Sequence, residues 1–308
     1  MAEQTSTVSG IALVDKPQGW TSHDIVAKSR RLFGTRKVGH AGTLDPMATG
    51  LLVLGVNSST RLLTYLVGLD KEYTATIRLG ASSVTDDAEG EILGYAPTSQ
   101  IQRVSPDQIA SAVLGLTGEI MQVPSSVSAI KVDGKRSYAR VRSGEQVELS
   151  ARPVTVSEFE ILNVYPTFAD EHAVIDVDVR VVCSSGTYIR ALARDLGFKL
   201  GVGGHLTALR RTRVGDFSVT ETLEFDPDAL PPSLVDPASA ATRVFPRLDL
   251  THVQALELTQ GKRPPVEANE GGPQAAVDPE GRLIGLVHVS KGVARTIVNF
   301  PADTQKVN

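Results

Sequence analysis

The chain has 308 residues, of which 41% are hydrophobic and 21% charged, a composition and length that fit one large or two smaller globular domains and exclude an intrinsically disordered protein. Its formal net charge of −4, taken as an average, argues against a nucleic-acid-binding protein. The single cysteine, Cys183, excludes an internal disulfide and a cysteine-based zinc site, so we expect a packing role for it and a reducing compartment.

The first ten residues lack the basic and apolar regions of a secretory signal. No apolar run approaches the ~18 residues of a membrane-spanning helix, and the run Leu51–Val56 has the length of a strand. Together with the single cysteine, these features predict a cytoplasmic protein without membrane contact.

The predicted elements of the first half are short strands and helices. Gly10–Val14 is an apolar run that predicts a strand, and Thr21 or Ser22 can cap a helix to about Phe33. The Gly- and Thr-rich stretch that follows, 35–50, predicts a loop. The remaining expected elements are a strand over 51–56, a short helix over 60–67, a strand over 71–79 and a helix over 106–114.

The second half is richer in strands. The dipeptide Asp133-Gly134 predicts a hairpin, followed by a short basic helix over 137–142. Strands are expected over 154–164, 173–183 and 205–214, a helix over 187–200 capped by Thr187, a helix over 251–260, and strands over 282–289 and 293–299. Because strands outnumber long helices in an irregular order, the sequence predicts an α+β fold with a mixed or antiparallel sheet and a small β-rich C-terminal domain.

The charge is unevenly distributed along the chain. Residues 16–61 hold seven Lys and Arg against two acidic residues, 124–153 hold six against three, and 180–213 hold seven against one. These three windows carry +14, so the rest of the chain carries −18. A fold that gathers the windows on one face would attract an anionic polymer to that face.

The loop His40–Gly50 places one carboxylate, Asp45, among glycine, threonine and apolar residues. Such a carboxylate acts as a nucleophile, a general base or a metal ligand, or it forms an Asx turn that caps the segment after Pro46. A metal site at Asp45 is poorly supported. His40 is close to Asp45 in the sequence, but no second carboxylate is close to it. From the residues alone, Asp45 can be either a nucleophile or a turn-capping residue.

Six segments, in order, resemble the motifs of one family. They are Val14–Ser22, Gly39–Leu51, Asp70–Tyr73, Ser128–Arg140, Cys183–Arg190 and Leu209–Arg211. Together they resemble the TruB family of bacterial tRNA pseudouridine synthases, over residues 10 to about 215. One Gly-rich loop would be weak support, whereas six ordered motifs favour a catalytic Asp45 over a turn-capping one.

The resemblance implies an enzyme that isomerises uridine to pseudouridine at position 55 in the T-loop of tRNA, by base flipping and with neither cofactor nor metal. The reaction breaks the C1′–N1 bond and rejoins the base through C5, so a group must hold the intermediate while the ring turns. The resemblance assigns this nucleophilic role to Asp45. Arg190 matches the arginine that pairs with the aspartate and keeps it ionised. Tyr73 matches the tyrosine that stacks on the extruded uracil and takes part in proton transfer.

The resemblance also implies substrate-binding residues. Tyr188 and Leu209 match residues of the uridine pocket, and His40 matches a residue that contacts the substrate and helps to extrude the base. Lys16 either meets a phosphate or supports the Asp45 loop, and both alternatives stay open. Phosphate contacts are expected in the RNA-clasping segment 124–150 and beside the pocket strand, from Lys131, Lys135, Arg136, Arg140, Arg142, Arg210, Arg211 and Arg213.

The implied organisation is a pseudouridine-synthase catalytic domain over 10–246 and a PUA-like RNA-binding domain over 247–308. The expected partner is the T stem-loop of tRNA, and a monomer is the default state. One alternative is a synthase of the same family that acts on another RNA, and a second is a tRNA-folding or RNA-binding protein with dispensable catalysis. The short C-terminal domain favours the tRNA enzyme over the first, and the intact Asp45, Tyr73 and Arg190 favour it over the second.

Overall fold

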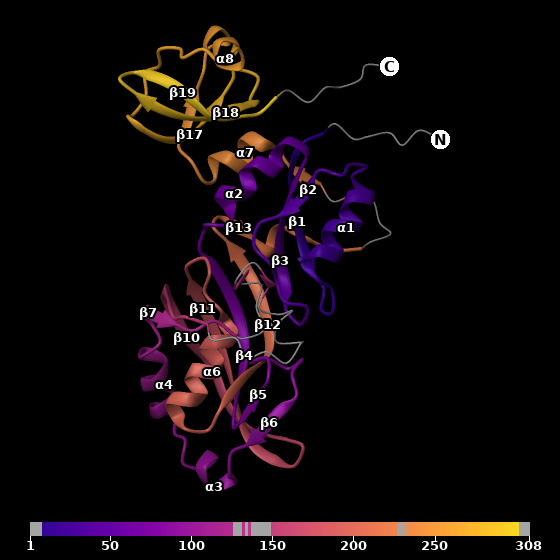
Figure 1. Ribbon diagram of the computed structural model, residues 1–308, viewed down its shortest axis with the longest axis vertical. Helices are drawn as coiled ribbons and strands as arrows, with labels where there is room; N and C mark the ends of the chain where they lie inside the picture. Colours follow the sequence, from indigo (N-terminus) through magenta and orange to yellow (C-terminus); the bar gives the residue numbers. More distant parts are fainter. Residues whose placement is uncertain are drawn as a thin grey trace. The chain divides into compact units, whose positions relative to one another are not determined.

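The computed structural model shown in Figure 1 describes residues 8–125, 131–132, 135–136, 149–226, 231 and 233–301. The chain divides into two compact units. Unit 1 comprises residues 1–46, 50–68 and 214–308, and unit 2 comprises residues 47–49 and 69–213. This grouping does not test the domain boundary expected at 246/247, which stays a prediction.

Unit 1 begins with a group of strands that pair in a mixed, parallel and antiparallel pattern. Strand β1 (Gly10–Lys16) pairs antiparallel with β3 (Thr49–Val56), and β3 pairs in turn with β2 (Val38–His40). Strand β1 also runs parallel to β14 (Leu223–Glu224) and antiparallel to β15 (Leu234–Val235). Nearly every residue of β1 and β3 is buried, which explains why both strands read as continuous apolar runs.

Helix α1 (Ser22–Leu32) follows β1 and starts with a capping box. The hydroxyl of Thr21 accepts a hydrogen bond from the backbone N–H of Asp24, and the Asp24 carboxylate accepts one from the backbone N–H of Thr21 at 3.0 Å. The hydrogen bonds from Thr21 hold the pKa of Asp24 below its ordinary value. The helix buries Ile25 and Val26, so its polar face is left toward solvent.

Unit 2 is built on a sheet of long strands. Their order is β12 (Gly204–Val214), β4 (Lys71–Leu79), β11 (His172–Cys183), β10 (Arg152–Ala169) and β7 (Gly118–Gln122). The pairs β4–β11, β11–β10 and β10–β7 are antiparallel. Strand β4 alternates strictly between buried and half-buried residues, so one face of this sheet is turned to the core.

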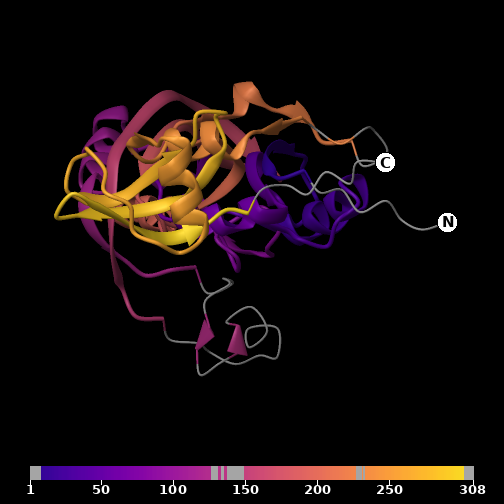
Figure 2. The ribbon, with the colours of Figure 1, turned by 90° about the horizontal axis from the view of Figure 1, so that it is seen from above.

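Helices cover the core face of this sheet in unit 2. Helix α4 (Pro106–Leu114) packs beside α6 (Ile189–Leu200), with α4 against β10 and α6 against β4, while α3 (Thr98–Ile101) contacts β11 (Figure 1). The ladder of β5 (Ala81–Ser83) with β6 (Ile92–Tyr95) encloses the turn that carries Asp86 and Asp87. Strands β8 (Lys131–Val132) and β9 (Lys135–Arg136) pair with each other (Figure 2).

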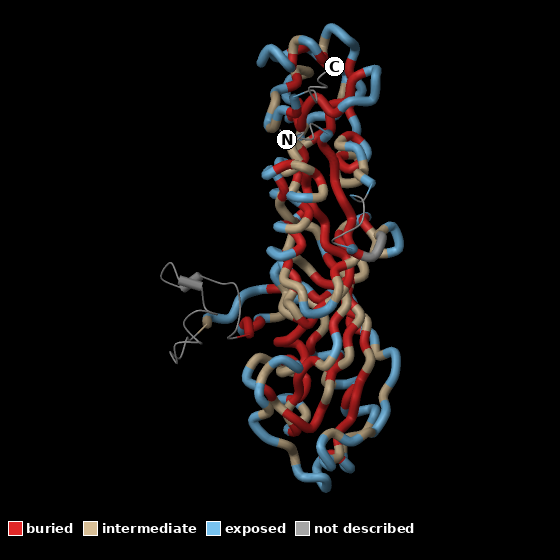
Figure 3. Tube along the Cα trace, turned by 90° about the vertical axis from the view of Figure 1, so that its right-hand side faces the viewer, coloured by how far each residue is buried: buried red, intermediate tan, exposed pale blue. Residues whose placement is uncertain are grey.

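The last part of unit 1 is a four-stranded sheet in the order β16 (Arg247–Asp249), β17 (Gly271–Val277), β18 (Leu283–Ser290), β19 (Val293–Asn299). Strand β16 is parallel to β17, and the other pairs are antiparallel. With α8 (His252–Thr259) these strands enclose their own hydrophobic cluster. Figure 3 colours the chain by burial and shows buried residues in red. The short elements not yet given are η1 (Asn57–Leu62), α2 (Leu63–Leu66), β13 (Phe217–Ser218), η2 (Val219–Glu221) and α7 (Pro237–Thr242).

The α+β fold class with a mixed sheet is confirmed, and so are the strand over 71–79, the helix over 106–114 and the hairpin pairing of β8 with β9. Two predictions were wrong. The stretch 35–50 is not all loop, because Val38–His40 pairs with β3. Thr187 does not cap α6: the N-cap is Tyr188, and the Thr187 hydroxyl donates to the carbonyl of Ser184 at 2.9 Å.

The predicted basic helix over 137–142 lies outside the described residues. Among the helices that the structure describes, none combines the length and apolar character needed to cross a membrane.

Candidate active site

Two contacts in unit 1 fix the backbone on either side of Asp45. Before it, the buried hydroxyl of Ser22 accepts from the N–H of Leu44 at 2.9 Å and donates to the carbonyl of Leu44 at 3.2 Å. After it, the carbonyl of Pro46 accepts from the N–H of Gly19 at 2.8 Å. Asp45 itself is half-buried. The loop is therefore held by the segment around the start of α1, which gives the carboxylate a defined position within unit 1.

Lys16 supplies a third contact to the same loop. Its side chain is fully buried, and its ammonium donates to the carbonyls of Trp20 at 2.7 Å, Pro17 at 2.9 Å and Pro46 at 3.3 Å. A buried ammonium that satisfies three carbonyls is not presented to a phosphate in solution. Of the two roles that the sequence left open for Lys16, this geometry favours support of the Asp45 loop.

His40 is the last residue of β2 in unit 1, opposite Leu54 of β3. Its ring lies edge-on to that of His23, an exposed residue of α1, with 5.7 Å between the ring centroids. The two imidazoles meet beside the start of the Asp45 loop, which begins at Ala41.

The tyrosine and leucine expected in the uridine pocket lie on neighbouring strands of unit 2. Tyr73 is a buried residue of β4, paired with Val181 of β11, and Leu209 is a buried residue of β12. Thr212 of β12 bonds to Glu72 of β4, and side chains alternate between the two faces of a strand. Tyr73 and Leu209 therefore share the face opposite to Glu72.

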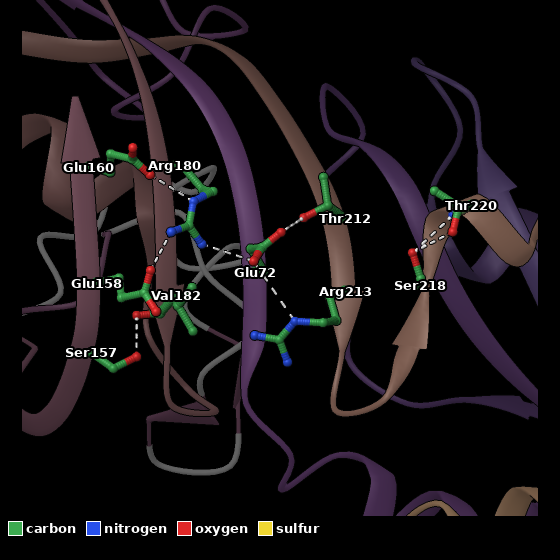
Figure 4. Close-up of polar contacts among 10 residues, drawn as sticks. All are labelled: Glu72, Ser157, Glu158, Glu160, Arg180, Val182, Thr212, Arg213, Ser218 and Thr220. Atoms are coloured by element: carbon green, nitrogen blue, oxygen red, sulfur yellow. Dashed lines mark hydrogen bonds and ion pairs between the residues drawn. The ribbon is translucent and has the colours of Figure 1, made fainter. Parts of the chain in front are cut away.

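The face of Glu72 carries a polar network that ties four strands together (Figure 4). Arg180 of β11 donates to Glu72 at 3.1 Å and to Glu160 of β10 at 2.9 Å, and it also pairs with Glu158. Glu72 accepts in addition from the Thr212 hydroxyl at 2.8 Å. The hydrogen bonds that Arg180 donates to Glu160 and Glu158 raise the pKa of its guanidinium, so its charge is permanent. The network fixes the register of the strand that carries Tyr73.

Arg190, expected to pair with the nucleophile, lies in the first turn of α6 and is almost fully buried. One guanidinium nitrogen lies 3.4 Å from the carboxylate of Asp87 and donates to the carbonyl of Thr85 at 3.0 Å. The Asp87 carboxylate also accepts from the N–H of Glu89 at 3.0 Å and from the Thr85 hydroxyl. A buried arginine held in this way keeps its charge in a fixed place.

The neighbouring acid, Asp86, ties the same turn to α6 and to the segment after β7. Its carboxylate accepts from the Ser125 hydroxyl at 2.7 Å and from Arg194 of α6 at 3.3 Å. Arg194 also donates to the carbonyl of Val123 at 2.7 Å. Burial raises the pKa of Asp86 above its ordinary value, against the opposing effect of Ser125 and Arg194.

The expected phosphate contacts are only partly visible. Arg211 is 1% exposed, so its side chain lies inside the protein rather than on the surface, and Arg210 donates to the Thr49 hydroxyl at 3.4 Å. Lys131 lies on β8, where the structure describes the backbone alone, and Arg140 and Arg142 lie outside the described residues. Tyr188 is half-buried at the N-cap of α6.

Lys71 and Cys183 form a buried pair of positions at the end of the β4–β11 ladder. Burial lowers the pKa of Lys71 to about 8, and nearby Arg211 acts in the same direction. Burial raises the pKa of the Cys183 thiol to about 11, so the thiol is protonated at neutral pH, in keeping with a packing role.

Within the described part of the chain, no group of three or more His, Cys, Asp or Glu side chains is placed to hold a metal ion.

Two residues that hold the site in place, Asp87 and Gln122, were not predicted from the sequence. The Gln122 amide contacts the backbone of Tyr188. A local signal for Asp87 exists, since Thr85–Gly90 is an acidic turn between two strands. Gln122 has no such signal, because its partner is 66 residues away along the chain.

Comparison with known families places this chain in a defined class. The model described as "TruB family pseudouridylate synthase (N terminal domain)" matches residues 30–189, more than half of the chain. The models described as "tRNA pseudouridylate synthase B C-terminal domain" and "tRNA Pseudouridine synthase II, C terminal" match residues 190–226 and 245–301. The chain therefore belongs to the TruB family of pseudouridylate synthases, which makes it an isomerase.

Curated relatives agree over nearly the whole length. A protein from Leifsonia xyli subsp. xyli named tRNA pseudouridine synthase B is 59% identical over 298 residues, covering 96% of this chain and 97% of that protein. Proteins of the same name from Arthrobacter sp. (strain FB24) and Streptomyces griseus subsp. griseus are each 53% identical, covering 97% of this chain and 99% and 100% of those proteins.

Solved structures share the fold at low sequence identity. A chain from a Cbf5-Nop10-Gar1 complex has a TM-score of 0.67 at 23% identity, covering 98% of this chain and 86% of that one. A chain from an H/ACA RNP bound to a substrate RNA has a TM-score of 0.66, also at 23% identity, covering 96% of this chain and 86% of that one.

Proposed function

We propose that this chain converts uridine to pseudouridine in tRNA and that its target is position 55 in the T-loop. The observation that supports tRNA as the substrate is the 59% identity to a protein named tRNA pseudouridine synthase B, over nearly the full length of both chains. Position 55 rests on the six ordered motifs of the family, which the sequence contains from Val14 to Arg211.

Asp45 is the proposed nucleophile. In the overall reaction the C1′–N1 bond breaks, the C1′–C5 bond forms, the proton leaves C5 and a proton is gained at N1. An ionised carboxylate can hold the intermediate while the ring turns. The fixed backbone on both sides of Asp45, through Ser22 at Leu44 and Lys16 at Pro46, supports this assignment because a nucleophile needs a defined position.

Arg190 is the proposed cationic partner that keeps the nucleophile ionised. Its support is a buried guanidinium that Asp87 and Thr85 hold in place. Tyr73 is proposed to stack on the extruded uracil and to take part in proton transfer, with Tyr188 and Leu209 lining the pocket and His40 contacting the substrate. The shared strand face of Tyr73 and Leu209 supports the pocket assignment.

Binding of the T stem-loop is assigned to the basic segment 124–150 and to a PUA-like domain over 247–308, appended to a catalytic domain over 10–246. The four-stranded sheet with its own hydrophobic cluster and the family model matched over 245–301 support the second assignment. The chain is proposed to act as a monomer in the cytoplasm.

The test is incubation with an unmodified tRNA transcript, followed by mapping of pseudouridine at single-nucleotide resolution. The proposal predicts modification at position 55 and none in a transcript in which that uridine is replaced by cytidine. Modification of another RNA in place of tRNA would favour the same-family alternative. Binding and refolding of tRNA without any pseudouridine would favour a tRNA-folding protein.

A further inference from the structure

Helix α6 starts without a cap of its own. Its N-cap residue is Tyr188, whose side chain makes no capping hydrogen bond. The first turn of a helix leaves N–H groups without intrahelical partners, and such groups need a partner when they are buried. This first turn carries Arg190, which is almost fully buried.

Gln122 supplies one of these contacts from another element, at the N–H of Tyr188. It is the last residue of β7 and is 1% exposed. Its amide oxygen accepts from the N–H of Tyr188 at 2.8 Å, and its amide nitrogen donates to the carbonyl of Tyr188 at 3.1 Å. One planar side chain thus bonds to both the N–H and the carbonyl of Tyr188, which orients the two peptide groups that flank this residue.

We propose that Gln122 is a positioning residue for pseudouridine formation, which sets the orientation of the Tyr188 ring and of the Arg190 guanidinium by fixing the backbone at the start of α6. The inference rests on the proposed roles of Tyr188 and Arg190. Both side chains leave the helix at or within its first turn, so a tilt or rotation of the peptide groups that flank Tyr188 moves both. A displacement of about 1 Å at a reacting group can cost about 100-fold in rate.

The rest of α6 has independent anchors, so the effect of Gln122 is local. Arg194 bonds to the carbonyl of Val123 and to Asp86, and the helix buries Leu192 and Leu196. Removal of the Gln122 amide therefore leaves the helix packed on the sheet but releases its first turn. This predicts a folded protein with a slow chemical step.

The experiment compares Gln122→Leu and Gln122→Glu with the unsubstituted chain. The control is Gln100→Leu, which makes the same chemical change at an exposed residue of α3. For each protein one measures the melting temperature, the Kd for tRNA and the single-turnover rate of pseudouridine formation between pH 5.5 and pH 8. All rates are taken well below the melting temperature.

The two variants differ in a way that separates positioning from stability. In Gln122→Glu, a protonated carboxyl group can accept and donate like the amide, whereas the ionised carboxylate repels the carbonyl of Tyr188. Relative to the unsubstituted chain at each pH, the Gln122→Glu rate should therefore rise as the pH falls. The Gln122→Leu rate should be lower by about 10- to 100-fold at every pH, with the Kd for tRNA unchanged.

A folded Gln122→Leu variant with the unsubstituted rate would overturn the inference, and so would a rate loss matched by an equal loss of tRNA binding. If Gln122→Leu does not fold, the pH dependence of the Gln122→Glu ratio decides: a rise toward low pH supports positioning and a flat ratio refutes it. No pseudouridine from the unsubstituted chain would overturn the proposed function itself, which distinguishes the two failures.

Discussion

The guanidinium of Arg190 and the carboxylate of Asp87 lie 3.4 Å apart, and both side chains are at most 5% exposed. The two residues come from the first turn of α6 and from the turn between β5 and β6, so the pair joins elements about 100 residues apart in the chain. A buried cation without a fixed counter-charge would be costly. Asp87 therefore makes a permanently charged arginine tolerable at this place.

Asp87→Asn should slow catalysis more than it weakens RNA binding. The amide retains a carbonyl oxygen for Thr85 and Glu89 but removes the negative charge facing Arg190. We expect a single-turnover rate about 10- to 100-fold lower and a free energy of unfolding lower by about 3 kcal/mol. Urea unfolding and single-turnover assays measure the two effects. Asp107→Asn, at an exposed position of α4, is the matched control, and an Asp87→Asn rate equal to that of this control would contradict the account.

Ser22→Ala should loosen the loop of Asp45. The substitution removes both hydrogen bonds to the backbone of Leu44 and leaves those buried groups without this partner. The expected cost is about 1–3 kcal/mol in the free energy of unfolding, with a rate loss that exceeds any change in the Kd for tRNA. Ser111→Ala, on the exposed face of α4, provides the comparison. Wild-type rate and stability in Ser22→Ala would show that this contact does not position Asp45.

The salt dependence of tRNA binding separates the two roles considered for Lys16. Because its ammonium is buried against three carbonyls, Lys16→Met should leave the slope of log Kd against log salt unchanged while lowering the rate. Neutralising Arg140 and Arg142 together should flatten that slope by about 1.5. A flattened slope in Lys16→Met would instead place its charge on a phosphate, and an unchanged slope in the arginine variant would remove both arginines from the interface.

His205 should make the protein less stable in acid. Its Nδ1–H donates to the carbonyl of Ala81 at 3.0 Å, and burial lowers the pKa of the imidazole below its ordinary value of 6.5. The unfolded chain therefore takes up the proton first, and the free energy of unfolding falls as the pH drops below about 6.5. His205→Gln should remove this part of the acid sensitivity, by about 1.4 kcal/mol for each unit of pKa difference. Urea unfolding between pH 7 and pH 5 measures this effect, with His288→Gln at an exposed position as the control. Equal pH dependence of the free energy of unfolding in the two variants would refute the prediction.

Local signals made much of the fold predictable. Lys71–Leu79 alternates between buried and half-buried residues, and Pro106–Leu114 follows a capping serine, so both elements have the predicted bounds. Strands β16 and β17 escaped prediction because a three-residue strand and one that opens with Gly-Gly-Pro lack a periodic pattern. Asp45, Tyr73 and Arg190 came from the resemblance to the family. The acidic turn around Asp87 is a local signal, but it does not reveal the pairing of Asp87 with Arg190. Gln122 acts through a partner 66 residues away, which no local pattern encodes.

The proposed role of Asp45 as the nucleophile of pseudouridine formation can be tested directly. The direct measurement compares the unsubstituted chain with Asp45→Asn in single-turnover assays on an unmodified tRNA transcript, with the Kd for the same transcript measured in parallel. We expect pseudouridine at position 55 from the unsubstituted chain. From Asp45→Asn we expect no detectable product, with the Kd for tRNA retained. Full activity of Asp45→Asn would contradict the proposed role.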